Sequence, residues 1–324
     1  MDFADKIAVV TGGGTGMGRE LVLQLIKAGA HVAMCDVSAE NMAATAAMCE
    51  LAEDQKLTQH VCDVSNEASV VAFRDEVVEA LETDHINLLF NNAGIGGGGE
   101  FVTGDRDEWE RVFAVCWYGV YYNCRAFMDL LVASDEGHII NTSSVNGFWA
   151  SIGPNVSHTS YAAAKFAVKG FTEALITDLR LNAPHVKASV VMPGHIGTSI
   201  AINSGLVLGR NAALEMNAEE VQEVRERLLK NGVPVDNVPD EHIREMVHQQ
   251  GVAFRDQAPT TAAQAATIIL QDVADGRWRI LVGDDAYQLD QLVRDNPEEA
   301  YEASFLEKMS GQGVLQGLIS TLED

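Results

Sequence analysis

The chain has 324 residues, and its 22 lysine and arginine residues stand against 47 aspartate and glutamate residues, so the formal net charge is −25. This charge repels phosphate backbones and anionic lipid head groups at long range, which makes nucleic acid and membrane surfaces poor candidate partners. The hydrophobic fraction of 47% is ordinary for a globular protein and unlike that of a disordered or fibrous chain.

The cysteine pattern and the hydropathy of the sequence indicate the cellular compartment in which the protein resides. Five cysteines occur without a CxxC pair, which indicates neither a disulfide framework nor a zinc site, and we expect no bound metal. No stretch approaches the ~20 apolar residues of a membrane span, and the first residues lack the basic and apolar regions of a signal peptide. We therefore expect a cytoplasmic protein with reduced thiols.

Short β-branched runs alternate with amphipathic segments of helix length, which predicts parallel strands joined by crossover helices. Strands are predicted at 7–10, 31–35, 60–62, 86–90, 138–142, 187–191 and 278–282. Helices are predicted after a turn at 11–18, through the forties, and at 68–81, 109–131, 161–181 and 260–273. The sequence thus predicts an α/β fold in which about seven strands form one doubly wound parallel sheet, within a single domain at 1–283.

Two segments exceed what this sheet needs. Residues 199–259 have helical patterning without a convincing strand, and we predict a helical lid inserted over a substrate. Residues 284–324 mix leucines with acidic residues, and we predict a C-terminal helical extension that packs on the body or on another subunit.

A glycine-rich turn, Thr11-Gly12-Gly13-Gly14-Thr15-Gly16-Met17-Gly18, follows the first strand and opens the first helix. Glycines there let the backbone approach a pyrophosphate, which the helix N-terminus also attracts. The alternative is a tight strand-to-helix connection that binds nothing.

An acid at the end of the second strand adds to this signal. Asp36 lies 18 residues after Gly18, where a carboxylate can accept hydrogen bonds from an adenosine ribose and would repel a 2′-phosphate. Neither Thr15 nor Val37 offers a compensating positive charge, so NAD is favoured over NADP. The alternative for Asp36 is an ordinary solvated acid.

A tyrosine and a lysine four residues apart, Tyr161 and Lys165, lie on one face of a predicted helix. An ammonium group near a phenol lowers its pKa from about 10 and makes proton transfer with an alcohol feasible. Ser144, at the end of the fifth predicted strand, is a third candidate whose hydroxyl could hold a substrate oxygen, with Ser143 as its competitor. Each signal alone is common, since a packed tyrosine, a solvated lysine and a capping serine are ordinary features.

Six short motifs in a fixed order make the combination specific. They are Thr11-Gly12-x-x-x-Gly16-x-Gly18, Asp63-Val64, Asn91-Asn92-Ala93-Gly94, Ser144, Tyr161-x-x-x-Lys165 and Pro193-Gly194-x-Ile196-x-Thr198. In this combination the chain resembles the classical short-chain dehydrogenase/reductase family. The resemblance implies a Rossmann-type sheet, a nicotinamide cofactor and oxidoreduction of an alcohol or carbonyl, with no metal.

The resemblance also implies roles for individual residues. Ser144, Tyr161 and Lys165 would be catalytic, with Tyr161 as the base in oxidation and the acid in reduction. The implied cofactor-binding residues are Gly12, Thr15, Gly16, Met17, Gly18, Asp36, Asp63, Val64, Asn91, Ala93, Gly94, Tyr161, Lys165, Pro193, Gly194, Ile196 and Thr198.

Two departures from the family pattern stand out. Cys116 occupies the position where the family usually has an asparagine that fixes a water linking the lysine to solvent, so proton relay would be slower or rerouted. The interval from Ser144 to Tyr161 is 17 residues, longer than usual, and residues 154–158 are expected to bulge at the rim of the site.

Apolar residues beside the motifs suggest the substrate. Phe148, Trp149 and Met192 are candidates for an apolar wall, and His195 could contact substrate. The insertion residues Ile200, Ile202, Leu206 and Leu208 could close above it. A bulky apolar or aromatic secondary alcohol would suit this wall, although equally these residues could simply pack the insertion on the body.

Three readings of function therefore stand. The leading one is an NAD-dependent oxidoreductase that interconverts a secondary alcohol and a ketone or aldehyde. The alternatives are a non-catalytic NAD-binding protein, motivated by Cys116, and a methyltransferase, for which the Tyr161/Lys165 pair has no purpose. A homodimer or homotetramer is expected, through the helices at 109–131 and 161–181.

Overall fold

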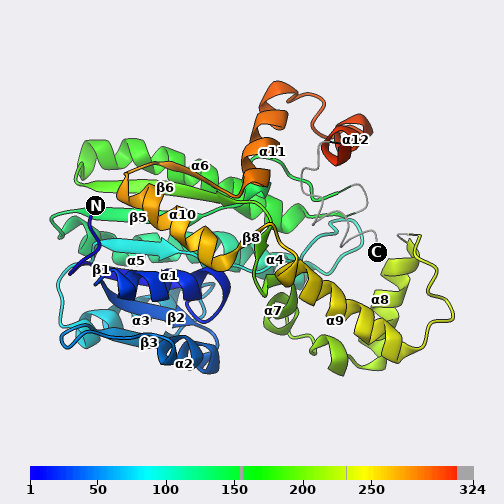
Figure 1. Ribbon diagram of the computed structural model, residues 1–324, viewed down its shortest axis with the longest axis horizontal. Coiled ribbons are helices and arrows are strands. Elements are labelled where there is room, and N and C mark those ends of the chain that lie inside the picture. The colour runs from blue at the N-terminus through cyan, green and yellow to red at the C-terminus, as the bar shows by residue number, and fades with distance from the viewer. Residues whose placement is uncertain (154–155, 231, 312–324) are drawn as a thin grey trace.

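The computed structural model describes residues 1–153, 156–230 and 232–311 (Figure 1). Its central sheet has seven strands in the order β3-β2-β1-β4-β5-β6-β9, and each neighbouring pair is parallel. The strands are β1 (Ile7–Thr11), β2 (His31–Asp36), β3 (Leu57–Val61), β4 (Leu88–Asn91), β5 (Gly137–Thr142), β6 (Val186–Pro193) and β9 (Arg279–Val282). The predicted doubly wound parallel sheet is thereby confirmed. Its strand order reverses between β1 and β4, where such sheets open a crevice at their carboxyl edge.

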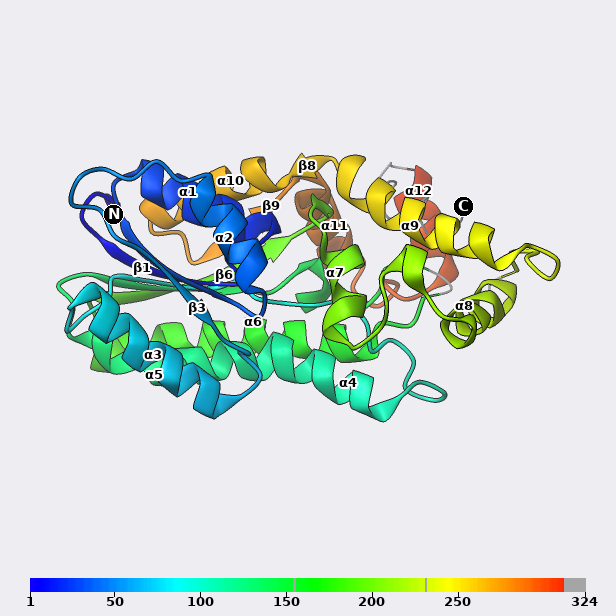
Figure 2. The same ribbon diagram turned by 90° about the horizontal axis from the view of Figure 1, so that it is seen from below.

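Helices cover both faces of the sheet, as Figure 2 shows. One layer contains α1 (Gly16–Lys27), α2 (Ala39–Ala47) and α10 (Ala262–Ala274), and the other contains α3 (Glu67–Leu81), α5 (Gly119–Val132) and α6 (Thr159–Asn182). Leu25 and Ile269 pack under the first layer, while Phe73, Phe127 and Val168 pack under the second. The strands read as nearly continuous apolar runs because they are buried on both faces.

The helix expected at 109–131 is interrupted. It consists of α4 (Arg106–Phe113), a π-helical turn η1 (Ala114–Tyr118) and α5. The π turn is a single turn within an otherwise α-helical segment, too short to be recognised from the apolar spacing of the sequence. The turn contains Cys116, whose side chain is fully buried.

The insertion expected at 199–259 is helical. It contains α7 (Ile200–Val207), η3 (Ala213–Glu215), α8 (Ala218–Lys230) and α9 (Asp240–Asp256), and a small core of its own lies between α8 and α9. Its base is joined by two short parallel strands, β7 (Ile196–Gly197) and β8 (Thr260–Thr261). Sequence periodicity missed this pair because each strand has only two residues.

The C-terminal extension begins with α11 (Asp284–Asp295) and α12 (Ala303–Gly311), and a 3₁₀ turn, η2 (Val145–Gly147), follows β5. Residues 312–324 of the predicted extension lie outside the described residues. The boundary at 283 between domain and extension stays a prediction. Among the helices that the structure describes, none is long and apolar enough to cross a lipid bilayer.

Gly18 fixes how closely α1 approaches β1. A Cβ atom at Gly18 would lie 1.9 Å from the carbonyl oxygen of Gly12, which is far inside van der Waals contact. Gly170, in the middle of α6, has no atom within 4 Å of the corresponding position. The two glycines therefore form a matched pair for testing this constraint.

We predict that Gly18→Ala lowers the free energy of unfolding by about 3 kcal/mol, because backbone must move to admit the methyl group. Gly170→Ala is expected to raise it by about 0.5 kcal/mol, since alanine is the better helix former. Urea denaturation of both variants measures the two effects. Equal stabilities for the two variants would contradict the close approach of α1 to β1.

Candidate active site

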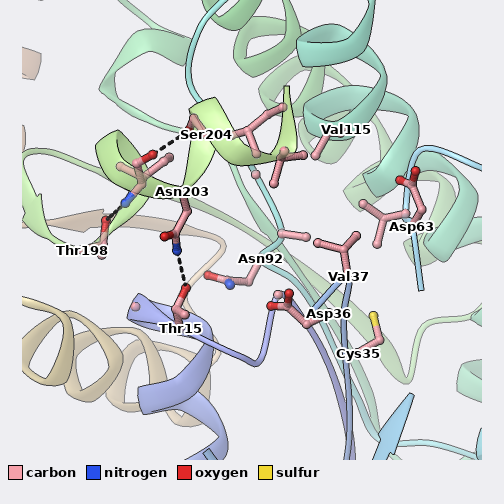
Figure 3. A pocket seen from close by; sticks show the side chains of 18 of the residues that line it. Thr15, Cys35, Asp36, Val37, Asp63, Asn92, Val115, Thr198, Asn203 and Ser204 are labelled. Atoms are coloured by element: carbon pink, nitrogen blue, oxygen red, sulfur yellow. Dashed lines mark hydrogen bonds between the residues drawn. The ribbon is translucent and has the colours of Figure 1, made fainter. Parts of the chain in front are cut away.

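Two adjoining hollows open at the carboxyl edge of the sheet. The first, which we call the Asp36 cleft, has a volume of about 160 Å³ and lies between the glycine turn and the ends of β2, β3 and β4 (Figure 3). Its lining includes ten of the residues predicted to bind a cofactor: Gly12, Thr15, Gly16, Met17, Asp36, Asp63, Val64, Ala93, Gly94 and Thr198. Tertiary folding thus brings the first three sequence motifs and Thr198 to one place.

The glycine turn suits a pyrophosphate. Gly12 and Gly16 have φ angles of +69° and +55°, a region that favours glycine. Thr15 precedes α1, and its side chain accepts no hydrogen bond from the first N–H groups of the helix. These N–H groups therefore stay available to a ligand. These groups and the helix dipole are the features that hold a dinucleotide phosphate in other doubly wound sheets.

Asp36 is held in place by backbone groups. Its carboxylate accepts hydrogen bonds from the N–H groups of Gly14 and Ser38, each at 3.0 Å. Arg111, the cation in the lining of the cleft, forms an ion pair with Asp63 at 2.8 Å. Burial of Asp63 opposes ionisation, but hydrogen bonds from Ser65 and Arg111 outweigh it and lower the pKa of Asp63. The cation of the cleft is therefore already neutralised by an acid.

Two predicted cofactor contacts are corrected. Asn91 does not line the cleft: it is buried in the sheet and donates to Asn141 Oδ1 at 2.8 Å. Its neighbour Asn92 lines the cleft instead, because successive residues of a strand point to opposite faces. Gly18 also lies outside the lining and acts through the packing of α1. Sequence reasoning missed Arg111 and Asn203, since neither belongs to a motif.

The second hollow, which we call the Tyr161 cavity, has a volume of about 720 Å³. It contains Ser144 from just beyond β5 and Tyr161 and Lys165 from α6. It also contains four predicted residues at and just after the end of β6, namely Pro193, Gly194, His195 and Ile196. The cavity and the Asp36 cleft share Met17, Asn92, Gly94, Thr198, Ile200 and Ser204, so they adjoin each other. The helix α7 lies over the boundary, where Asn203 donates to Thr15 at 3.4 Å (Figure 3).

Ser144, Tyr161 and Lys165 come together in this cavity. Lys165 is 2% exposed, its Nζ donates to the carbonyl oxygen of Thr142 at 2.8 Å, and it lies 5.3 Å from the centre of the Tyr161 ring. Ser144 Oγ accepts a hydrogen bond from the N–H of Asn146 at 3.1 Å, and the Ser144 hydroxyl also interacts with the phenol of Tyr161.

The pKa of Tyr161 differs from the sequence-based expectation. Burial raises the pKa of Tyr161 above its usual value, and the hydrogen bond with Ser144 opposes that rise. Burial also lowers the pKa of Lys165. Burial thus opposes the charged forms of both groups, the phenolate of Tyr161 and the ammonium of Lys165, because desolvation penalises a charge.

Comparison with known proteins decides the family. A family model described as short chain dehydrogenase matches residues 6–206. The chain belongs to the short-chain dehydrogenase family. This membership makes the protein an oxidoreductase by family and argues against the methyltransferase reading.

Three relatives illustrate the family match. A Mycobacterium tuberculosis protein that bears the name oxidoreductase SadH is 32% identical over 292 residues, which are 90% of this chain and 91% of SadH. A solved short-chain dehydrogenase/reductase from Burkholderia phymatum in complex with NAD is 29% identical, with a TM-score of 0.68 over 92% of this chain and 96% of that one. A metagenomic short-chain oxidoreductase in complex with NADP is 30% identical, with a TM-score of 0.51 over 59% of this chain and 84% of the other. Similar dehydrogenases thus bind either dinucleotide.

Cys116 marks where this dehydrogenase departs from the family pattern. Its thiol donates to the carbonyl oxygen of Ile95 at 3.2 Å from within the π turn. It also lies near Lys165, since a Cβ at Gly94 would be 3.5 Å from Lys165 Nζ and 3.8 Å from Cys116 Sγ. A buried thiol therefore lies near Lys165, where the family pattern has an amide.

The predicted substrate wall of the dehydrogenase is largely wrong. Phe148, Trp149 and Met192 do not line the Tyr161 cavity but pack with α11 and α12 in a separate core cluster. The Trp149 indole donates to the carbonyl oxygen of Ala300 at 2.6 Å, and its ring lies 5.9 Å from that of Phe305. The C-terminal extension needs an apolar surface to bury, and these side chains supply it.

His195 does line the cavity, and one of its two ring nitrogens is hydrogen-bonded, whereas Nδ1 is buried without a partner among the described residues. Nε2 donates to the carbonyl oxygen of Phe254 in α9 at 2.8 Å, and its backbone N–H donates to Asp285 in α11 at 2.7 Å. His195 thus connects the insertion to the C-terminal extension. Of the four predicted insertion residues, Ile200, Ile202 and Leu208 line the cavity, whereas Leu206 is half exposed outside it.

His158 is a lining residue that sequence reasoning placed only in a rim loop. Its ring centre lies 4.7 Å from that of Tyr161, and it precedes the first turn of α6. Burial lowers the pKa of His158 to about 4, so the ring is neutral near pH 7. A neutral imidazole beside the phenol leaves the cavity wall uncharged at this point.

Proposed function

We propose that this dehydrogenase uses NAD to interconvert a secondary alcohol and the corresponding ketone or aldehyde, with a bulky apolar or aromatic substrate. The convergence of Ser144, Tyr161 and Lys165 in one cavity that adjoins the Asp36 cleft carries this proposal. The cavity volume of about 720 Å³ falls in the range that suits a substantial organic ligand.

The roles of the three residues follow from their contacts. Ser144, with its acceptor side used by Asn146, would donate its hydroxyl hydrogen to the reacting oxygen. Tyr161 would take the alcohol proton in oxidation and return it in reduction. Lys165, anchored on Thr142, would hold a nicotinamide ribose and stabilise the phenolate. A bound nicotinamide supplies the chemistry of hydride transfer.

NAD is the cofactor that we favour. The Asp36 carboxylate is fixed by Gly14 and Ser38 and faces the cleft, where it suits ribose hydroxyls and repels a 2′-phosphate. Arg111 offers no free charge to a phosphate, because Asp63 already pairs with it.

A non-catalytic NAD-binding protein is the competing function, and Cys116 is the residue that motivates it. Retention of Ser144, Tyr161 and Lys165 in one cavity supports the catalytic proposal instead.

We predict that Tyr161→Phe lowers kcat about a thousandfold, because the phenol that exchanges the proton is removed. Calorimetry is expected to give the same NAD affinity for wild type and variant to within the error. Reduced-cofactor absorbance with a panel of secondary alcohols and ketones measures turnover. Tyr287→Phe, a change at a half-exposed residue of α11, is the control. Wild-type NAD binding without turnover across the panel would favour the non-catalytic alternative.

A second prediction concerns cofactor choice. Asp36→Ala is expected to weaken NAD binding about tenfold, through loss of charge-assisted hydrogen bonds, and to relieve the discrimination against NADP. Titration calorimetry with both dinucleotides measures these affinities. Asp256→Asn, which changes an acid paired with Arg255 in α9, is the matched control. Tighter binding of NADP than of NAD by the unchanged protein would overturn the assignment.

We also propose a homodimer or homotetramer that associates through α5 and α6. Phe166 and Val132 on these helices are each 42% exposed, and exposed apolar side chains on adjacent helices are typical of subunit interfaces. Phe166→Asp is expected to shift the protein to monomers in light scattering. Met48→Asp, at an exposed residue beyond α2 on the other face of the sheet, should leave the mass unchanged. A monomeric wild-type protein would refute this assembly.

A further inference from the structure

The Tyr161 cavity extends beyond the catalytic residues into the helical insertion. Its lining there mixes apolar residues with charged ones from the segment after α7 and from α8. The apolar residues of this outer part are Ile202, Leu208, Leu214, Met216, Val247 and Phe254. The charged ones are Arg210, Glu215, Glu220, Glu223 and Arg227. A ligand that reaches from Ser144 to α8 would therefore meet both apolar and charged side chains.

The carboxylates near Arg227 are mostly committed to other partners. Glu108 accepts a hydrogen bond from the N–H of Gly98 at 2.9 Å with one oxygen and pairs with Arg210 through the other. Glu100 pairs with Lys230 at 2.8 Å and accepts a hydrogen bond from Thr103. Both acids therefore have their oxygens occupied.

The remaining acids of the lining leave Arg227 without an ion pair. Glu220 accepts hydrogen bonds from Asn211 and from the N–H of Asn217, each at 2.8 Å. Glu215 and Glu223 are exposed, and neither lies in an ion pair with Arg227. Among the described residues, Arg227 forms no ion pair at all, although the chain as a whole is strongly acidic.

The surroundings of Arg227 are those of a cavity wall rather than a free surface. Solvent reaches its side chain, yet burial by nearby protein lowers its pKa, and the charge of Arg210 lowers it further. Glu108, Glu100 and Glu223 act in the opposite sense without cancelling this. Because Arg227 lines the cavity, its guanidinium can donate a charge-assisted hydrogen bond to an anionic ligand bound there.

We propose that Arg227 binds a carboxylate at the far end of the substrate, so that the natural substrate is a hydroxy or oxo acid whose reacting carbon and carboxylate are separated by an apolar chain. This inference deepens the proposed function and rests on it for the identity of the reacting group. Among the described residues Arg227 lacks an ion pair whereas Arg210 pairs with Glu108, and one such guanidinium matches a monoanion. A dianionic phosphate would leave one negative charge without a partner.

Binding of unreactive probes tests the proposal without any need for turnover. We expect the full-length protein to bind dodecanoate more tightly than dodecanol in titration calorimetry. Arg227→Gln is expected to weaken dodecanoate binding about tenfold, and to weaken dodecanol binding much less. Arg106→Gln, which removes the same charge from an exposed side chain paired with Glu110, should weaken neither. Dodecyl phosphate distinguishes a phosphate from a carboxylate.

Three results would overturn the proposal. They are equal affinity of the wild-type protein for dodecanoate and dodecanol, an equal loss of both in Arg227→Gln, and tighter Arg227-dependent binding of dodecyl phosphate than of dodecanoate. In turnover, long-chain oxo acids should exceed their methyl esters in kcat/KM, and Arg227→Gln should reduce that ratio about tenfold. Turnover without this preference would also overturn the proposal. Absence of turnover, with dodecanoate binding as expected, would refute the proposed function but not the carboxylate-binding site.

Discussion

A buried hydrogen bond from Lys165 Nζ to the carbonyl oxygen of Thr142, 2.8 Å long, holds the proposed catalytic centre together. Burying an amine costs several kcal/mol unless it has polar partners, so Lys165 constrains α6 to lie against the end of β5. The neighbouring hydroxyl of Ser143 donates to the carbonyl oxygen of Lys165 at 2.7 Å and adds a second tie between the same two elements. Ser144 and Tyr161, one residue and one helical turn away from these ties, are brought into one cavity as a result.

The parallel sheet supplies the edge on which this centre is built. Because β1, β4, β5 and β6 run in the same direction, the segments that follow them meet at one side of the molecule. The Asp36 cleft forms where the strand order reverses, and the Tyr161 cavity adjoins it under the insertion. The pair of strands β7 and β8 joins the two ends of the insertion. Hydrogen bonds of His195 to Phe254 and Asp285 link the insertion to the C-terminal helix α11.

Much of this arrangement could be predicted from local patterns. The glycine turn, Asp36 and the Tyr161/Lys165 spacing are short-range features, and alternating apolar runs indicate strands and helices regardless of context. The direction of side chains at the ends of strands was harder to predict. Asn91 was predicted to face the cofactor, but its neighbour Asn92 lines the cleft instead. The role of Trp149 was not predictable either, because its partners Ala300 and Phe305 lie some 150 residues later in the chain.

The sequence by itself determined the α/β class, the parallel order of its elements, the family and the residues proposed to be catalytic, since each depends on neighbours within one strand or one helical turn. Only the tertiary structure decided which apolar residues face a ligand and which face the C-terminal helices, and whether a charged side chain is already paired. Arg227 illustrates the difference: in the part of the chain that the structure describes it has no ion pair, because Glu108 and Glu100, more than a hundred residues earlier, pair with Arg210 and Lys230. Burial and ion pairing depend on residues that are far apart in the chain and come into contact only in the folded protein, so local sequence patterns cannot predict them.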